Sequence, residues 1–600
     1  MSPAKGKPVK DHIFGDLDQP QNAVRWFIDR YRGVRHNHRM TPVRPKPGET
    51  VNLHATVSSD LNIESVFVWL TTDDWQHHHV EKLTKARTVW NTALWSYLQE
   101  WVITIPPQPA GTMLRYKIGA ELQGSSKILY ADSQSEDFET ATHFSTWYGE
   151  DTQPGWAERA ITYQIFVDRF NPGEDRSWAS YTDLKKPFGG TLQGIIEKMP
   201  FIKSMGFNTV WLTPIFDSPS HHGYDISDYY QINPRLGSME DFMKLVKVAH
   251  LHKIKVILDF VANHCSSEHP YFQDAVSDPD SPYRDYFVWK DWPEYECFYN
   301  VRTMPKLNLS YGNPARDYLF KTAQFWLKTG LDGFRLDYAH GPEQDFWVDF
   351  RRACTAINPE VWTFAEIVQP PDVQANYACG VSGALDFLLC QVLRLTFGQR
   401  EWPLDKFAAF LQNHFDYFPE DFSLPAFLDN HDMNRFLFTS ELDEKLLKLA
   451  LLVLYTLPGP PIVYYGTEIP LSQRQSIHEK GAQGFDEARL PMDWGAVEES
   501  DLPGYLAKLA EIRQTTPRIY QQGWKLFSSG DHKDFIVLTK TREEGLYLLI
   551  NRSEKTVSWQ LNETVFRIFV DLVTDHRFTV NDGQLSLSVE PHSATLLSPI

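Results

Sequence analysis

The sequence predicts an α/β protein with a (β/α)8 TIM barrel at its centre and an antiparallel β-domain on each side. From Ala160 onward, apolar runs of strand length alternate with helical stretches over about 350 residues, which favours a parallel β/α fold, most commonly the (β/α)8 barrel at that size. Short runs of alternating apolar and polar residues flank this region, as in antiparallel sheets. At 600 residues with 42% hydrophobic residues, the chain can bury several cores.

Residues 1–150 are expected to form an N-terminal β-sandwich. Their strand candidates are TVNLHATV (50–57), SVFVWL (65–70), SYLQEWVITI (96–105) and MLRYKIGAEL (113–122). Turn residues separate these runs, and a small sandwich is the natural way to pack them. The segment from Arg25 to Pro47 is rich in arginine, so it is either a solvated basic arm or a segment that docks on an acidic face or a partner subunit.

Residues 151–512 are expected to form the barrel, and residues 513–600 a C-terminal β-domain. The strand candidates of the barrel are AITYQIFVDRF (160–170), FNTVWLTPI (207–215), IKVILDFVANH (254–264), DGFRLDYAH (332–340), VWTFAEIV (361–368), LPAFLDNHD (424–432) and PPIVYYGTEI (460–469). A helix is predicted over 238–253, because Ser238 and Asp241 form a capping-box pair ahead of an apolar-periodic run. DFIVLTKT and LYLLINRS flank REEG (542–545) as a β-hairpin.

Polar residues collect at the carboxyl-terminal ends of these strands. They are Asp259, Asn263 and His264 on one strand, Asp337 and His340 on another, Glu366 on a third, and His431 and Asp432 on a fourth. In a barrel these ends share one face, which carries the active site. A single aspartate at a strand end is more often a helix cap or an ion-paired residue, but several carboxylates on separate strands indicate catalysis. Arg335 and Asp337 share a strand face, whereas Phe334 and Leu336 point to the other face.

The composition argues against several classes of function. A net charge of -19 is unfavourable for binding nucleic acid or an acidic membrane surface. No GxGxxG follows a strand, and neither GxxxxGK[ST] nor HExxH occurs, so dinucleotide, nucleotide and zincin chemistry lack support. The five cysteines include no CxxC pair, which predicts free buried thiols. No apolar run has membrane-spanning length and no signal-like segment opens the chain, so a cytoplasmic location is expected.

Carboxyl groups alone can cleave a glycosidic bond. One carboxylate attacks the anomeric carbon while the other, still protonated, donates a proton to the leaving oxygen; retention of configuration requires the pair to be roughly 5 to 5.5 Å apart. Neighbouring strand ends at one barrel mouth can supply that spacing. Arg335 is then expected to keep Asp337 ionised and oriented, while nearby negative charges raise the pKa of Glu366.

Several motifs carry a resemblance to a known family. In chain order they are YQIFVDRF (163–170), HGYDISDYY (222–230), DFVANH (259–264), MPKLNL (304–309), GFRLDYAH (333–340), FAEIV (364–368), FLDNHD (427–432) and PGPPIVYYGTE (458–468). DFVANH, GFRLDYAH, FAEIV and FLDNHD resemble the four ordered motifs of the α-amylase family, glycoside hydrolase family 13. The resemblance implies that Asp337 is the nucleophile, Glu366 the general acid/base, and Asp432 the third acid, which holds the distorted sugar by its hydroxyls.

The resemblance also implies a set of sugar-binding residues. Tyr224 would stack on the sugar at the cleavage site. His264, Arg335 and His431 would form hydrogen bonds around it. His340 stands where many members carry a lysine that contacts the sugar on the leaving-group side. Residues 265–312, inserted after the third strand, would be the family's domain B.

Within the family, MPKLNL and the N-terminal β-domain resemble the cyclomaltodextrinase, maltogenic amylase and neopullulanase group. This implies hydrolysis of α-1,4 bonds in cyclodextrins and short maltooligosaccharides, with transglycosylation, and a homodimer formed through the N-terminal domain. Two alternatives stay open. One is a general α-amylase, oligosaccharide α-glucosidase or glucanotransferase using the same site, and the other is an inactive glucan-binding or scaffold relative.

No cofactor is expected to be required, and a bound calcium ion stays open as an alternative. In the family, the loop after the first strand often binds calcium through Asn and Asp side chains, including an aspartate directly after a Gly-Gly pair. Here Thr191 follows Gly189 and Gly190, and a neutral hydroxyl is a poorer ligand for a hard cation. The other candidate calcium ligands are Asn171, Glu174 and Asp175.

Overall fold

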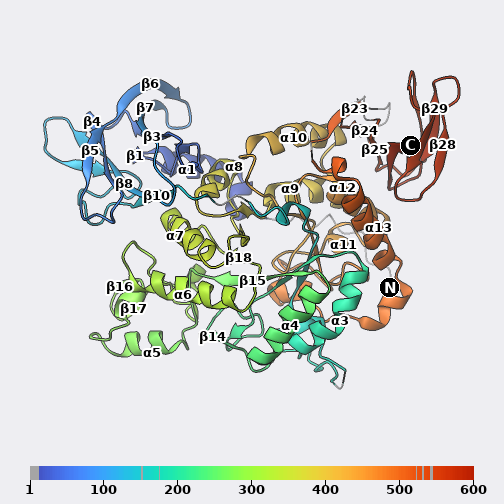
Figure 1. Cartoon of the computed structure of the whole chain (residues 1–600), viewed down its shortest axis with the longest axis horizontal. Coiled ribbons are helices and arrows are strands. Elements are labelled where there is room, and N and C mark those ends of the chain that lie inside the picture. The colour runs from blue at the N-terminus through green and yellow to red at the C-terminus, as the bar shows by residue number, and fades with distance from the viewer. Residues whose placement is uncertain (1–12, 151–152, 175, 522, 530–532, 541–544) are drawn as a thin grey trace.

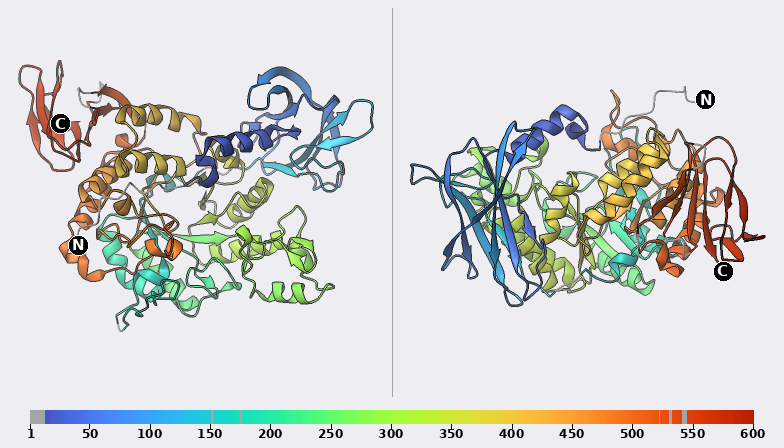
Figure 2. Two further views of the ribbon diagram at one scale, coloured as in Figure 1. Left: turned by 180° about the vertical axis from the view of Figure 1, so that it is seen from behind. Right: turned by 90° about the horizontal axis from the view of Figure 1, so that it is seen from above.

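The structure is a computed structural model that describes residues 13–150, 153–174, 176–521, 523–529, 533–540 and 545–600. It confirms the predicted fold class, with a central parallel barrel, antiparallel sheets before it and further antiparallel sheets after it. The N-terminal sheets and the C-terminal sheets lie at opposite ends of the molecule (Figure 1). A view from above shows the same separation (Figure 2). Within the described residues, no helix is long and apolar enough to cross a membrane.

Two antiparallel sheets form the N-terminal part. The first has the order β1 (Val34–Arg35), β3 (Val51–Ser58), β7 (Ser96–Ile105), β6 (Thr84–Asn91), with β2 (Met40–Thr41) also paired to β3; the second has β10 (Phe144–Trp147), β8 (Met113–Leu122), β4 (Ile63–Thr71), β5 (His79–Lys82), with β9 (Ile128–Tyr130) paired to β8. The four runs expected as strands are β3, β4, β7 and β8. Buried side chains such as Val51, Leu53, Val66, Val68 and Tyr116 form one core.

The basic segment docks on the chain's own barrel. Part of it forms helix α1 (Pro20–Tyr31), and Arg44 then donates to the carbonyl oxygens of Ala378 (3.0 Å) and Val381 (2.6 Å). Arg44 also lies 3.7 Å from Asp421, and Arg30 lies 3.7 Å from Asp372. The segment therefore docks on an acidic face, which was one of the alternatives left open by the sequence. That face belongs to the barrel.

Eight parallel strands make the barrel. In chain order they are β11 (Thr162–Ile165), β12 (Thr209–Leu212), β15 (Lys255–Val261), β18 (Gly333–Asp337), β19 (Trp362–Ala365), β20 (Gly383–Ala384), β21 (Ala426–Phe427) and β22 (Pro461–Tyr464). The α-helices between and after them are α2 (Val167–Phe170), α3 (Leu192–Ser204), α4 (Met239–Leu251), α5 (Pro270–Ser277), α6 (Pro314–Lys328), α7 (Gln344–Thr355), α8 (Pro371–Gln374), α9 (Phe387–Leu393), α10 (Leu404–Tyr417), α11 (Phe436–Thr439), α12 (Glu444–Thr456) and α13 (Leu502–Thr515). Helix α4 begins with the predicted capping box of Ser238 and Asp241.

The sheet closes between β20 and the residues that lead into β21. A parallel bridge joins Gly383 to Ser423, and the Asp386 amide donates to the carbonyl oxygen of Pro425 at 2.9 Å. The sequence did not predict β20, because only two residues of this strand pair and both are small. The strand expected over 160–170 was too long, since the chain turns into helix α2 (Val167–Phe170) directly after β11.

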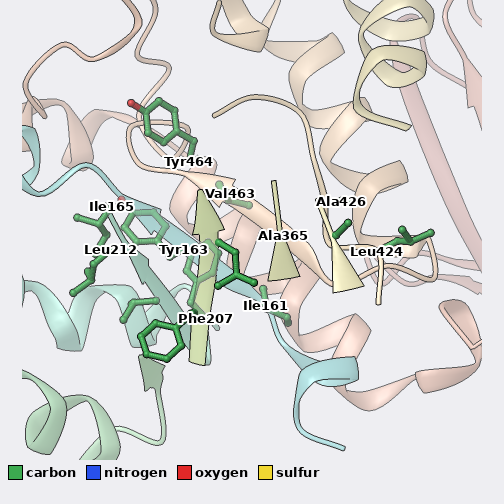
Figure 3. Close-up of a cluster of buried hydrophobic side chains, with 14 of the residues drawn as sticks. Ile161, Tyr163, Ile165, Phe207, Leu212, Ala365, Leu424, Ala426, Val463 and Tyr464 are labelled. Atoms are coloured by element: carbon green, nitrogen blue, oxygen red, sulfur yellow. The ribbon is translucent and has the colours of Figure 1, made fainter. Parts of the chain in front are cut away.

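Each barrel strand presents two buried faces. One face packs against the surrounding helices, as Figure 3 shows for Ile161, Tyr163, Ile165, Leu212 and Val463. The other face fills the barrel interior with a separate apolar cluster that includes Trp211, Ile257, Trp362, Phe364 and Ile462. Burial on both faces is what allows these strands to be apolar nearly throughout.

The segment between β15 and α6 contains α5 (Pro270–Ser277) and the short strands β16 (Trp289–Asp291) and β17 (Glu294–Tyr295), on the same side of the barrel as the N-terminal sheets (Figure 1). After α13, β24 (Phe535–Thr539) and β25 (Tyr547–Asn551) pair antiparallel as predicted. Their sheet also contains β23 (Lys525–Ser529), β30 (Ser593–Pro599), β27 (Ile568–Asp571) and β28 (Arg577–Thr579), and β26 (Val557–Leu561) pairs with β29 (Leu585–Val589). All five cysteines are free, four of them buried and Cys297 partly buried.

Glu468, in the turn after β22, is a fully buried carboxyl group that generates a prediction about stability. Burial raises the pKa of Glu468 to about 7. One carboxyl oxygen accepts a hydrogen bond from Tyr163, and the other has no partner. In an unfolded chain a glutamate ionises near pH 4.3. Between about pH 4.3 and 7 the unfolded state therefore holds fewer protons than the folded state, so this group lowers stability as the pH rises.

Glutamine cannot ionise, so the Glu468→Gln variant does not lose stability as the pH rises through this range. We expect its stability advantage over the natural chain to grow from about pH 4.3 to 7 and to stay constant above pH 7. The gain should be on the order of 3 kcal/mol in the free energy of unfolding. Urea denaturation at pH 5 and pH 8 measures it. Glu498→Gln, at an exposed glutamate, is the control, and a Glu468→Gln difference that does not change with pH would contradict the argument.

Candidate active site

A buried arginine organises the carboxyl-terminal mouth of the barrel. Arg335, on β18, has no exposed surface. Its NH1 nitrogen donates to Oδ1 of Asp259 (2.7 Å) and to Oδ1 of Asp337 (2.9 Å). Its NH2 nitrogen lies 2.8 Å from Oε2 of Glu366 as an ion pair without hydrogen-bond geometry. One guanidinium therefore contacts three carboxyl groups, which come from three adjacent strands.

The strand register explains this convergence. Asp259 lies opposite Arg335 in the pairing of β15 with β18, and Asp337 follows two residues later on the same face. Arg335 in turn lies opposite Phe364 of β19, so Glu366, two residues beyond Phe364, reaches the same level as Asp337. The predicted shared face of Arg335 and Asp337 is confirmed. The Tyr338 amide donates to Oε2 of Glu366 at 2.9 Å and fixes that carboxyl group.

Asp432 enters the mouth from the loop after β21. Its Oδ1 accepts a hydrogen bond from NH2 of Arg489 at 2.7 Å, and its Oδ2 lies 3.0 Å from Nε2 of His431. Arg489 also donates from Nε to the carbonyl oxygen of His431 at 2.7 Å. The carboxyl group is thus held from both sides while about a third of its side chain stays exposed to the mouth.

Tyr224 and His431 form the wall beside these carboxyl groups. Their rings are parallel, with centroids 5.5 Å apart and an interplanar angle of 2°. The Tyr224 hydroxyl donates to Oδ2 of Asp259 at 2.9 Å and is also hydrogen bonded to Nε2 of His431. Nδ1 of His431 pairs with the side-chain amide of Gln164 at 2.8 Å. Gln164 therefore sets the tautomer of the ring, with the proton on Nε2.

His264 and His340 lie at two further edges of the mouth. His264 is buried, its ring stacks on Phe298 at 4.6 Å, and its Nε2 nitrogen has no hydrogen-bond partner. His340 follows Asp337 by three residues and contacts the ring of Tyr338, with centroids 4.1 Å apart. Burial lowers the pKa of His264 to about 3 and that of His340 to about 4. Both rings are therefore neutral near pH 7 and can exchange hydrogen bonds with an uncharged ligand.

The carboxyl groups differ in their tendency to ionise. Burial raises the pKa of Glu366, and the charge of Asp432 adds to the shift. The raised pKa predicted for Glu366 is thus found, although burial is its first cause. Burial also raises the pKa of Asp337 despite the opposing charge of Arg335, whereas Arg335 was expected to keep this group ionised. For Asp432, burial raises the pKa, but His431 and Arg489 together lower it below its usual value.

Sequence reasoning missed three residues of this arrangement. Asp259 was recognised at a strand end but given no role, whereas the structure places it fully buried against Arg335, Tyr224 and Trp211. Gln164 lies on the first strand inside YQIFVDRF, and its polarity within an apolar strand was the available signal. Arg489 lies far from any strand end, so no local pattern connected it with Asp432.

Thr191 and Asn171, in the loop where the family often binds calcium, have hydrogen-bond partners within the chain. The Thr191 hydroxyl accepts from the Gly194 amide as the N-cap of α3 and donates to the carbonyl oxygen of Pro172. The Asn171 amide donates to the carbonyl oxygen of Gly194. Asp175 lies outside the described residues. Across the part of the chain that the structure describes, no group of three or more His, Cys, Asp or Glu side chains is arranged to hold a metal ion.

Comparisons with known proteins agree with this geometry. Residues 164–511 match the family model described as alpha amylase, catalytic domain. The chain is 32% identical to alpha-amylase 2 of Dictyoglomus thermophilum over 98% of both chains, and 28% identical to a cyclomaltodextrinase of Geobacillus thermopakistaniensis over 86% of this chain and 93% of that one. A solved structure titled cyclomaltodextrinase matches 94% of this chain and 99% of its own with a TM-score of 0.68, at 23% identity, and supports the fold.

The contacts of Arg335 generate a prediction that separates orientation from charge. Arg335→Lys keeps the positive charge but loses the planar fork that contacts three carboxyl groups, so we expect hydrolysis of maltooligosaccharides to slow by at least tenfold while the thermal unfolding transition is retained. Arg335→Met leaves buried carboxylates without a cation, and we expect it to lose about 3–5 kcal/mol of unfolding free energy at neutral pH.

Enzyme kinetics and urea denaturation of both variants measure these effects. Full activity of Arg335→Lys would show that a point charge is sufficient. A lysine variant that fails to fold would show instead that the arginine is chiefly structural.

Proposed function

Since this chain belongs to the α-amylase family, glycoside hydrolase family 13, we propose that it cleaves α-1,4-glucosidic bonds of cyclodextrins and short maltooligosaccharides with retention of the anomeric configuration. The observation that carries this proposal is the pair of carboxyl groups, Asp337 and Glu366, bound to the two terminal nitrogens of one guanidinium. Retaining glycosidases need their two carboxyl groups roughly 5 to 5.5 Å apart, whereas inverting enzymes leave room between them for a water molecule, and contact with one shared guanidinium supports the shorter spacing.

We assign the two roles from the contacts of each carboxyl group and from the family motif. Asp337 accepts a charge-assisted hydrogen bond from Arg335, which favours its carboxylate form. For Glu366, the contact with Arg335 and the hydrogen bond from the Tyr338 amide favour the carboxylate form, whereas burial and the negative charge of Asp432 favour the protonated form. The pKa values of both buried carboxyl groups are raised, so the pair retains a proton, and we place that proton on Glu366 because it holds the acid position of the family motif FAEIV. Asp337 is therefore the nucleophile and Glu366 the general acid.

The reaction then proceeds in two steps that use only carboxyl groups and water. In the first, Asp337 attacks the anomeric carbon, the bond to the leaving oxygen breaks, and Glu366 transfers its proton to that oxygen. In the second, the Glu366 carboxylate removes a proton from water, the water oxygen bonds to the anomeric carbon, and the ester bond to Asp337 breaks. If a sugar hydroxyl replaces water in the second step, the product is a transglycosylation product.

The surrounding residues bind the sugar. Asp432, ionised and held by Arg489, accepts hydrogen bonds from the hydroxyls of the distorted ring. Tyr224 offers an aromatic face, and His264 and His431 contribute neutral hydrogen-bonding groups. His340 contacts the sugar on the leaving-group side, because it lies beyond Tyr338, whose amide binds the acid. A general α-amylase, an α-glucosidase or a glucanotransferase would use the same residues, since these activities differ in which substrate or acceptor enters.

We expect Glu366→Gln to distinguish the acid from the nucleophile. A substrate with a good leaving group, such as an aryl α-maltoside, needs little proton donation, so the variant should still release its aglycone. Maltotriose, with a poor leaving group, should be cleaved at least a thousandfold more slowly. Pre-steady-state kinetics on both substrates measures the first step. Equal losses on the two substrates would remove Glu366 from the role of acid.

The substrate class is tested by parallel digestion of γ-cyclodextrin, maltoheptaose, pullulan and soluble starch. The N-terminal sheets and the 265–312 insertion lie on one side of the barrel (Figure 1). We propose that they narrow access to the mouth, so we expect cyclodextrin and maltoheptaose to be cleaved faster than starch. Product analysis with added glucose measures transfer against hydrolysis. Faster attack on starch than on cyclodextrin would favour the general α-amylase.

We also propose that the protein works in the cytoplasm as a homodimer formed through the N-terminal sheets. Its five free cysteines suit a reducing compartment. Trp90, Trp95 and Tyr97 form an exposed cluster at the β6–β7 hairpin, with ring centroids 5.5 and 5.1 Å from Trp90, and Trp95 is 76% exposed. Aromatic residues are enriched at the buried centre of protein interfaces.

Sedimentation velocity tests the dimer. We expect Trp95→Asn to shift the protein toward monomer, because asparagine tolerates the left-handed backbone (φ 51°) at this position but cannot fill an apolar interface. Val565→Asn, at an exposed apolar residue in the loop between β26 and β27, should leave the mass unchanged. A natural chain that sediments as a monomer would contradict the proposal.

A further inference from the structure

A cavity of about 890 Å³ lies at the amino-terminal end of the barrel. One side of it is lined by Leu424, which leads into β21, and by Gly459 and Pro460, which lead into β22. The carboxyl groups of the mouth follow the opposite ends of the barrel strands, and none of the residues assigned above to catalysis or sugar binding lines this cavity. Its volume is within the roughly 300–1,000 Å³ range of small-molecule sites.

Helix α10, which lies beside β23, forms a second side of the cavity (Figure 1). Gln412, Phe415 and Asp416 line the cavity from this helix, and their spacing of three and four residues places them on one helix face. Phe418 and Phe422 follow the helix, and their rings stack with centroids 5.9 Å apart. This side therefore presents an amide and a carboxyl group next to aromatic surface.

A buried arginine holds the opposite side of the cavity in place. Arg513 of α13 donates to four carbonyl oxygens of residues 455–459, at 2.7 to 3.3 Å, where the chain passes from α12 toward β22. The ring of Tyr520 packs on the same guanidinium, with 4.2 Å between the ring centroid and Cζ. Tyr520, Pro458 and Gly459 all line the cavity, so this side is fixed before a ligand enters. A preformed side lowers the entropic cost of binding.

The lining suits an uncharged ligand rich in hydroxyl groups. Its polar side chains include Gln412, Asp416, Glu158 and Glu420. Within the residues that the structure describes, none of these side chains forms a hydrogen bond or an ion pair, so all are free to bind a ligand. Amides donate and accept hydrogen bonds and carboxylates accept them, which matches the hydroxyls of a sugar. Among the described lining residues Lys525 is the one cation beside three carboxylates, which disfavours an anionic ligand.

We propose that this cavity is a second, non-catalytic binding site for a short neutral oligosaccharide, represented by maltotriose. The type of sugar rests on the proposed function, because a chain that cleaves α-glucans is exposed to short α-glucans. In a (β/α)8 barrel the catalytic groups lie at the carboxyl-terminal end, so a sugar at the amino-terminal end is held without being cleaved. Gln412 and Asp416 bind its hydroxyls, and the half-buried ring of Phe415 packs against its apolar face.

Calorimetric titration of maltotriose into the inactive Asp337→Asn chain measures this site. We expect two classes of site, one at the mouth and one in the cavity. Adding Gln412→Ala and Asp416→Ala removes two hydrogen-bonding groups from α10 without lowering its helix propensity, and should weaken the second class roughly 10- to 30-fold. Asn413→Ala, at an exposed residue of the same helix outside the cavity, is the control and should keep both classes. Unchanged binding in the Gln412→Ala, Asp416→Ala chain would overturn the proposal.

Photoaffinity labelling locates the sugar. Maltotriose that carries a diazirine at its reducing end should label the peptic peptide of Asp337→Asn that contains Gln412 to Phe422. Label confined to peptides of the mouth, or displaced from the cavity by spermidine, would overturn the proposal, and the second result would show that the cavity takes an organic cation.

A further measurement separates this inference from the proposed function. In the active chain, Gln412→Ala with Asp416→Ala should leave kcat/KM for an aryl α-maltoside within about twofold, because neither residue lies at the mouth. A larger loss would contradict a site that takes no part in the reaction. The binding and labelling experiments use a chain that need not turn over. A natural chain that cleaves no α-glucan would therefore refute the proposed function, while the second site would still be decided by maltotriose binding.

Discussion

The site depends on one buried guanidinium, which neutralises carboxyl groups from three strands. Arg335 has no exposed surface, and Asp259, Asp337 and Glu366 all lie within 3 Å of its nitrogens. Buried charges are tolerated only when they are paired, so the pairing of β15, β18 and β19 is fixed by this contact. A slip of one residue would point the charges outward into the apolar layer between strands and helices. The same register brings a nucleophile and an acid together.

The other residues of the site are connected to Arg335 and its carboxyl groups through hydrogen bonds. Asp259 accepts a hydrogen bond from the Tyr224 hydroxyl, and this hydroxyl is also hydrogen bonded to His431. The His431 ring in turn lies 3.0 Å from the Asp432 carboxylate. Arg489 donates a hydrogen bond to Asp432 from the other side. The two arginines, Arg335 and Arg489, therefore give the carboxyl groups of the mouth two different environments. Asp432 stays ionised beside Arg489, whereas burial makes the cluster around Arg335 retain a proton, and that difference is what acid catalysis requires.

Much of this could be predicted from the sequence, because its signals are local. Asp337, Glu366 and Asp432 each follow an apolar strand, and the carboxyl-terminal ends of barrel strands share one face. Other features depend on contacts between distant residues. Strand β20 pairs only Gly383 and Ala384 and has no apolar run, and Arg489 reaches Asp432 from a loop with no strand beside it. The seam between Arg115 and Asp349, which positions the N-terminal sheets, joins residues 234 positions apart, and neither residue is unusual in its own segment.

The assignment of Asp337 as nucleophile is the claim on which the chemistry depends, and trapping the covalent intermediate tests it most directly. A 5-fluoro-α-glucosyl fluoride has a good leaving group but a destabilised second step, so the glycosyl enzyme accumulates and can be located by mass spectrometry of a peptic digest. We expect the added sugar on the peptide that contains Asp337, and no label in Asp337→Asn. A label on Glu366 or Asp432, or turnover to the inverted anomer without any labelled peptide, would contradict the assignment.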